Sequence, residues 1–191
     1  YYFAPASLDA ASLKALEAAA KNSPTLPLVL DLRRQASWDF ENALAWADAF
    51  LDEGEAARVK TSEGEKARFA ETGRSVAPPR LAVLVDASTA GAAELLAAAL
   101  HARAGAVLAG EPTFDMARSQ ETVALSTGGA LHISTKEYLL PGGGALEGKG
   151  LQPDLAAKDD PATPEDEARS LLEKNTWQES KPEAAPLKEA A

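Results

Sequence analysis

The sequence predicts an α/β fold with a mixed, largely parallel sheet flanked by helices. Short apolar segments alternate along the chain with segments of helical periodicity, which is the pattern of strands joined by crossover helices. Residues 28–32 and 81–85 are apolar at almost every position, as expected of strands covered on both faces. No internal repeat is visible, so we expect one domain rather than an array.

In the first part of the chain, residues 1–5 begin with an aromatic segment and end with a proline, which predicts a short strand. Ser7 is the expected N-cap of a helix that continues to residue 22, with Leu8, Leu13 and Leu16 on one side. The strand at 28–32 follows. A second amphipathic helix is expected at 39–52, where Gly54 stops it.

The middle of the chain is predicted to contain a polar hairpin and a buried helix. Residues 55–77 mix charged with single apolar residues, and Gly64 is expected near the turn of the hairpin. The strand at 81–85 leads into an alanine-rich helix at 91–103, which Gly105 closes. Further strands are expected at 106–109, 122–125, 130–135 and 137–140. The glycines at 142–144 are expected to form a turn, because the lysine and helix of a phosphate-binding loop are missing.

We expect three segments in all: a core domain at 1–158, a C-terminal helix at 159–176 and a disordered tail at 177–191. Thr163 and Pro164, followed by acidic residues, form a good helix start. The last segment is rich in Pro, Glu, Ala and Lys, a composition that does not support a packed core.

Composition excludes several classes of function. The chain has 191 residues with 29 Asp and Glu against 19 Lys and Arg, a net charge of −10, which argues against nucleic acid as the main partner. It has no cysteine and two histidines without ligand spacing, so neither a metal site nor another cofactor is expected. No segment approaches the ~20 apolar residues of a transmembrane helix, and no signal peptide is visible in this chain.

Two strand-to-helix junctions are the expected location of a functional site. Residues 31–38 and 86–94 both follow buried strands, and in α/β folds ligands bind where strands end and helices begin. The free N–H groups of a helix N-terminus can stabilise an anion or a developing oxyanion.

The residues at these junctions resemble the C-terminal processing (tail-specific) serine peptidases, which use a Ser–Lys dyad on a crotonase-like α/β core. Four landmarks carry the resemblance in the right order. Residues 30–33 match L-D-L-R, 47–51 match A-D-L-F-L, 110–114 match G-E-x-T-F, and 148–154 match G-K-G-I-x-P-D. The resemblance covers the chain from residue 1 to about residue 157, and it implies the crotonase-like fold.

The departures from the family pattern fall at the catalytic positions. Gly91 occupies the position of the nucleophilic serine, and Met116 occupies that of the general-base lysine, while the accessory glutamine is kept as Gln120. The resemblance places the former oxyanion and substrate cleft at Ser37, Trp38 and Ala92. Trp38 stands in a segment where the family has glycines, and there it would crowd the backbone N–H groups.

These departures predict a protein that has lost peptidase activity. Glycine has no hydroxyl and methionine is not a base, and a serine–base pair acts as a unit. Met116 has two interpretations: it fills the core, or it lines a cleft that has become an apolar binding site. The hydroxyls of Ser88 and Thr89 are expected to cap the helix rather than to attack a substrate.

We therefore expect a pseudopeptidase that binds a peptide or protein or acts as a scaffold. The alternatives are an active serine endopeptidase with a non-standard nucleophile, such as Ser88 or Ser119, and an architectural domain that forms a homo-oligomer. The resemblance also implies a periplasmic or cell-envelope location. Active relatives usually carry a PDZ domain upstream, and no such domain is present in this chain.

Overall fold

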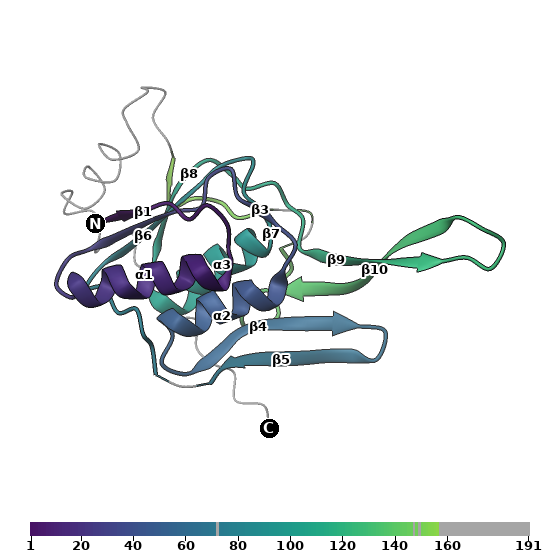
Figure 1. Ribbon diagram of the computed structural model, residues 1–191, viewed down its shortest axis with the longest axis horizontal. Coiled ribbons are helices and arrows are strands. Elements are labelled where there is room, and N and C mark those ends of the chain that lie inside the picture. Colours follow the sequence, from purple (N-terminus) through teal and green to yellow (C-terminus); the bar gives the residue numbers. More distant parts are fainter. Residues whose placement is uncertain (72, 147, 149, 157–191) are drawn as a thin grey trace.

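A five-stranded parallel sheet forms the centre of the computed structural model, which describes residues 1–71, 73–146, 148 and 150–156 (Figure 1). The expected helix at 159–176 and tail at 177–191 lie outside the described residues. The strands follow chain order across the sheet, so right-handed crossovers place the connecting helices on one face. They are β1 (Tyr2–Phe3), β2 (Leu28–Asp31), β6 (Leu81–Val85), β8 (Val107–Gly110) and β11 (Leu155–Ala156).

Three helices cover that face of the sheet: α1 (Ala10–Asn22), α2 (Phe40–Phe50) and α3 (Ala92–Ala104). Their apolar side chains share one hydrophobic cluster with strand residues such as Leu30 and Val83. The first nine residues of α3 are all buried, and its alanines allow α2 and the sheet to approach closely. The predicted α/β architecture is confirmed.

The start of α1 differs from the prediction. Asp9, not Ser7, is the N-cap: its carboxylate accepts a hydrogen bond from the Ser12 N–H at 2.7 Å. Ser7 instead donates its hydroxyl to the Asp9 carboxylate at 2.5 Å. A carboxylate is at least as good a cap as a hydroxyl and also interacts favourably with the positive end of the helix. The helix therefore begins after Asp9 rather than after Ser7.

A second, antiparallel sheet consists of two hairpins in the strand order β5-β4-β10-β9. Its strands are β4 (Gly54–Thr61), β5 (Gly64–Ala70), β9 (Arg118–Ala124) and β10 (Ala130–Leu139). The separate strands predicted at 130–135 and 137–140 are one strand, with a bulge between Ser134 and Lys136 that imitates a break in the alternation. Strand β9 also begins four residues before the predicted position.

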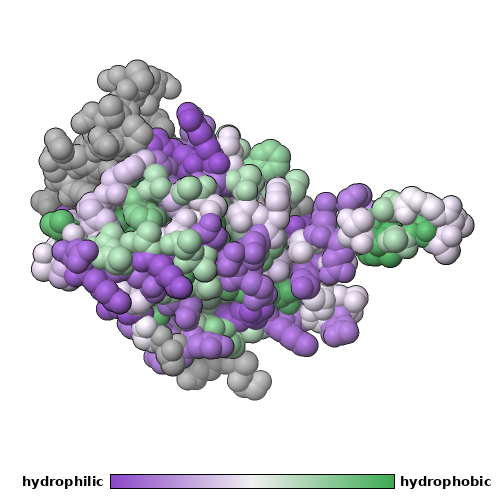
Figure 2. Space-filling model, in the orientation of Figure 1, coloured by the Kyte–Doolittle hydropathy of each residue, from purple (hydrophilic) through white to green (hydrophobic). Residues whose placement is uncertain are grey.

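The β9–β10 hairpin projects from the body of the molecule (Figures 1 and 2). Apolar side chains on one of its faces are exposed to solvent: Val123, Leu125, Leu131 and Ile133. The base of the hairpin, by contrast, packs onto the main body through Tyr138, whose ring stacks on Phe40 with a centroid distance of 3.7 Å.

A two-stranded pairing that the sequence does not predict joins the two junctions. Strands β3 (Ala36–Ser37) and β7 (Ala90–Gly91) run parallel, and Ser37 stands opposite Gly91. Strands of two residues carry no periodicity, so sequence patterns cannot reveal them. This pairing places the segment after β2 against the N-terminus of α3.

Candidate active site

The turn before α3 is fixed by a threonine that does not cap the helix. The Thr89 hydroxyl is buried, donates to the Leu32 carbonyl at 2.9 Å and accepts from the Asp86 N–H at 3.0 Å. The expectation that Thr89 caps α3 is therefore wrong, because its hydroxyl bridges the two junctions instead. Ser88 is exposed, and its N–H donates to the Asp86 carboxylate.

Gly91 is the N-cap of α3, with φ +65° and ψ −120°, a conformation that side-chain-bearing residues rarely adopt. A Cβ atom at this position would lie 2.3 Å from the Ser37 carbonyl oxygen and 2.8 Å from a carbon of the Trp38 ring. Position 91, to which the resemblance assigns the nucleophile, thus has neither a side chain nor the space for one. Ala92, the first residue of α3, follows directly.

The carboxylate of Glu94 connects the backbone at Gly91 with the backbone at Met116. It is fully buried, and one of its oxygens accepts the Gly91 N–H at 2.9 Å and the Met116 N–H at 2.8 Å. The other oxygen accepts the Thr113 hydroxyl at 2.5 Å and the Asp115 N–H at 2.7 Å. Sequence reasoning assigned Glu94 no role, although a glutamate at the third helical position is the signal of a capping box.

Met116 lies at the wall of a cleft rather than in the core. It is half-buried and lines a cavity of about 320 Å³. A neighbouring cavity of about 390 Å³ shares Trp38 and Ser119 with the first, so the two cavities meet at these residues and are treated as one cleft. The residues around the first cavity are Trp38, Met116, Arg118, Ser119, Gln120 and His132.

The structure thus brings together most of the residues that the resemblance singles out. Gln120 lies in β9 and lines the cavity with Met116. His132 contacts Thr122 on the neighbouring strand at 3.0 Å and also lines this cavity. The other histidine, His101, lies near the end of α3, 3.2 Å from the Asp154 carboxylate.

No pair of a lysine amine and a hydroxyl is assembled in the part of the chain that the structure describes. No lysine amine there is hydrogen-bonded to a serine or threonine hydroxyl; Lys60, for instance, pairs with Glu137 at 3.6 Å. Nor does any group of three or more potential metal ligands occur among those residues. Lys149 lies outside the described residues.

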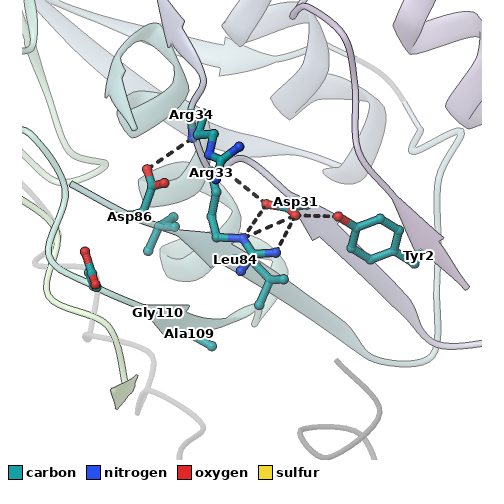
Figure 3. Close-up of a pocket in the computed structure, with 10 residues that line it drawn as sticks. Tyr2, Asp31, Arg33, Arg34, Leu84, Asp86, Ala109 and Gly110 are labelled. Atoms are coloured by element: carbon teal, nitrogen blue, oxygen red, sulfur yellow. Dashed lines mark hydrogen bonds and ion pairs between the residues drawn. The ribbon is translucent and has the colours of Figure 1, made fainter. Parts of the chain in front are cut away.

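A separate cavity of about 440 Å³ lies at the carboxyl ends of β2, β6 and β8, and Leu84 and Ala109 are among its lining residues (Figure 3). The Asp31 carboxylate accepts a hydrogen bond from the Tyr2 hydroxyl and forms an ion pair with Arg33 at 2.8 Å. Burial acts to raise the pKa of Asp31, but the hydrogen bonds from Arg33 and Tyr2 outweigh it, so that the pKa lies below its ordinary value.

The parallel sheet with its helices and the second antiparallel sheet form an α/β fold of the kind found in serine-type processing peptidases. The model of peptidase family S41 matches residues 6–157, and the chain belongs to that family. The resemblance seen in the sequence is therefore confirmed, and with it the α/β fold class.

Curated relatives include carboxy-terminal-processing proteases of Bartonella bacilliformis and Bacillus subtilis. They are 30% and 33% identical to this chain, each over 132 residues and 68% of its length. Among solved structures, the photosystem II D1 C-terminal processing protease superposes with a TM-score of 0.77 and 25% identity, covering 92% of this chain and 47% of that one. The chain spans 30% and 28% of the two curated relatives.

Proposed function

We propose that this chain is a non-catalytic member of peptidase family S41 that binds a peptide or protein segment in the cleft around Trp38. The observation that carries the proposal is the junction itself. Gly91 has no hydroxyl, Met116 has no amine, and the Glu94 carboxylate holds the main-chain N–H groups of both in place. These contacts support a junction whose backbone is held in place while the hydroxyl and the amine of the family pattern are missing.

The loss of chemistry follows from the residue types. A serine attacks a carbonyl only when a base accepts its proton, and a lysine is such a base only when its pKa is lowered. The Thr89 hydroxyl on the same turn does not replace it, because it is already engaged with the Leu32 carbonyl. Removing one member of such a unit lowers kcat by several powers of ten.

The binding role rests on the cleft. Trp38 is 53% exposed and lines both cavities of the cleft, and Met116 lines one of them. Aromatic and methionine side chains at a concave surface are typical of sites that hold apolar groups of a peptide.

The bacterial and chloroplastic relatives are processing proteases, so their substrates are polypeptides, and an extracytoplasmic location is part of the proposal. None of the described helices is long and apolar enough to cross a membrane.

Catalysis is tested with a fluorophosphonate probe and with cleavage of a permanently unfolded carboxymethylated protein. The native chain should show neither labelling nor cleavage. Labelling of Ser88 or Ser119 together with cleavage would overturn the proposal in favour of an active endopeptidase with a non-standard nucleophile. Restoration of activity needs Trp38→Gly in addition to Gly91→Ser and Met116→Lys, because the indole ring occupies the space that a residue at 91 would enter.

Binding is tested by titrating the same carboxymethylated protein against the native chain and Trp38→Ala. We expect the affinity to fall at least about tenfold, since burial of one aromatic side chain is worth more than 1.4 kcal/mol. Phe69→Ala is the matched control, because Phe69 is 64% exposed on β5 and lines neither cavity of the cleft. Equal affinities of the native chain and Trp38→Ala would mean that the polypeptide does not bind in the cleft around Trp38.

A further inference from the structure

The exposed apolar residues of the β9–β10 hairpin share one face. In an antiparallel pair, residues directly opposite each other lie on the same face, and so does every second residue along a strand. Val123 stands opposite Leu131, and Ile133 follows Leu131 by two positions. Leu125 extends the ladder, since its N–H donates to the Gly129 carbonyl at 3.1 Å. These four apolar residues, between 38% and 49% exposed, form the outer apolar face, and Figure 2 shows hydrophobic surface on the projecting hairpin.

This face leads into the cleft at the base of the hairpin. The bulge of the ladder lies in β10, so the alternation along β9 is unbroken and Ser119 shares the face of Val123. Ser119 stands opposite Lys136, and both line the cavity of about 390 Å³ beside Trp38. The outer apolar face is therefore the outward continuation of this cavity along the hairpin.

The charge of the hairpin indicates the chemistry of its occupant. Residues 119–135 contain a single Asp, Glu, Lys or Arg, which is Glu121, although these four types make up 25% of the chain. Grouped apolar side chains in a segment with few charges are typical of the centre of a binding surface. A charge brought against this face would lose its hydration without gaining a partner, so the occupant is uncharged where it touches the face.

Two other occupants fit this face less well. A second copy of the chain would bring a net charge of −10 against an equal charge, which opposes association. A lipid membrane is typically met by Trp, Tyr, Lys or Arg side chains at its surface, and residues 119–135 contain none of these. A polypeptide is favoured because the face begins at the cleft around Trp38.

The length of the face sets the length of the bound segment. From Ser119 to Leu125 the hairpin extends about 20 Å, at about 3.3 Å per residue. An extended polypeptide of about six or seven residues covers the same distance. Because every second side chain of an extended chain points the same way, about three of them would meet the outer apolar face.

We propose that the outer apolar face is the outer part of the peptide cleft and binds an extended, uncharged polypeptide segment with an apolar side chain at every second position. The segment begins at Trp38 and lies along the hairpin over Ile133, Leu131 and Val123. This inference rests on the proposed function, because the same polypeptide occupies the cleft. It adds the class of sequence that the cleft selects.

Two double variants of the hairpin are titrated with the carboxymethylated protein as probe. Val123→Thr with Leu131→Thr removes apolar surface from the outer apolar face and supplies β-branched side chains, which suit a strand. Ala124→Thr with Ala130→Thr is the matched control, because this exposed pair lies one position further along the ladder on the opposite face. We expect the first variant to bind the probe about tenfold more weakly and the control to bind it like the native chain.

Trp38→Ala, measured beside them, separates this inference from the proposed function. Weaker binding by Trp38→Ala but not by Val123→Thr with Leu131→Thr would keep the cleft and refute its extension along the hairpin. Weaker binding by the hairpin variant alone would make the face a separate site and refute its continuity with the cleft. An equal loss in the control variant would also refute the inference, and native affinity in every variant would refute both proposals.

Sedimentation and vesicle flotation test the other two occupants. A native dimer that Val123→Thr with Leu131→Thr dissociates would assign the face to a second copy of the chain. Flotation with phosphatidylcholine vesicles that the same change abolishes would assign the face to a membrane. Either result would overturn the inference, and we expect a monomer that does not float.

Discussion

Replacement of Gly91 by alanine tests the geometry of the candidate site most directly. Two effects add at this position. A residue with a Cβ at positive φ is disfavoured by about 1–2 kcal/mol. The added atom would also meet the Ser37 carbonyl oxygen at 2.3 Å and the Trp38 ring at 2.8 Å, a degree of overpacking that destabilises by about 1–3 kcal/mol. We therefore expect Gly91→Ala to lower the free energy of unfolding by roughly 2–5 kcal/mol.

Gly105→Ala is the reference for a positive φ at a helix end without a close neighbour. Gly105 has φ +66° and ψ +29°, in the left-handed region, against ψ −120° at Gly91, and no atom lies within 4 Å of the position of its Cβ. Urea unfolding of both variants should give a loss of about 1–2 kcal/mol for Gly105→Ala and a clearly larger loss for Gly91→Ala. Equal losses would refute the close approach of β3 to β7. Combination with Trp38→Gly should recover part of the loss at Gly91, which a double-mutant cycle measures.

Three further variants test the buried and strained groups. Glu94→Gln places an amide where two of the four hydrogen-bond donors to this side chain point. It should reduce the free energy of unfolding, measured by urea titration, by about 2–4 kcal/mol. The control Glu53→Gln, at an exposed position, should change it by less than about 0.5 kcal/mol. Because the folded-state pKa of Asp31 is depressed, its ion pair stabilises the protein above the unfolded-state pKa, and this stability is lost as pH falls below about 4. Asp31→Asn should flatten that part of the curve of melting temperature against pH, and an unchanged slope would contradict the assignment. Asp115→Gly should raise the free energy of unfolding by about 1 kcal/mol in thermal melts. Asp115 has φ +76° and a buried carboxylate oxygen without a hydrogen-bond partner among the described residues. Arg34→Gly should raise the free energy of unfolding by less, because Arg34 has φ +60° but is exposed.

The sequence predicts the central part of the fold well, because its signals there are strong. The apolar segments at 28–32 and 81–85 and the alanine-rich helix closed by Gly105 correspond to β2, β6 and α3. The errors occur where local signals compete. Asp9 displaces Ser7 as the N-cap, and the bulge after Ser134 divides one strand into two apparent ones. The β3–β7 pair could not be foreseen, since two-residue strands form only when the tertiary fold brings them together.

The candidate site is predictable in its residue types but not in its connections. The absence of a hydroxyl at Gly91 and of an amine at Met116 follows from the motifs alone. The sequence does not show that Glu94 joins both positions, because the bonds run to main-chain N–H groups that carry no residue signature. Nor does the sequence reveal that the Trp38 ring lies within 3 Å of the position that a Cβ atom of residue 91 would occupy.

Main-chain hydrogen bonds do not depend on the side chain of the residue that donates them. The buried carboxylate of Glu94 therefore holds the loop at residues 115 and 116 against the start of α3 through bonds that a change of side chain at position 116 leaves in place. Position 91 differs, because a Cβ there would meet the Ser37 carbonyl oxygen at 2.3 Å. New chemistry at this junction is therefore more readily installed at position 116 than at position 91.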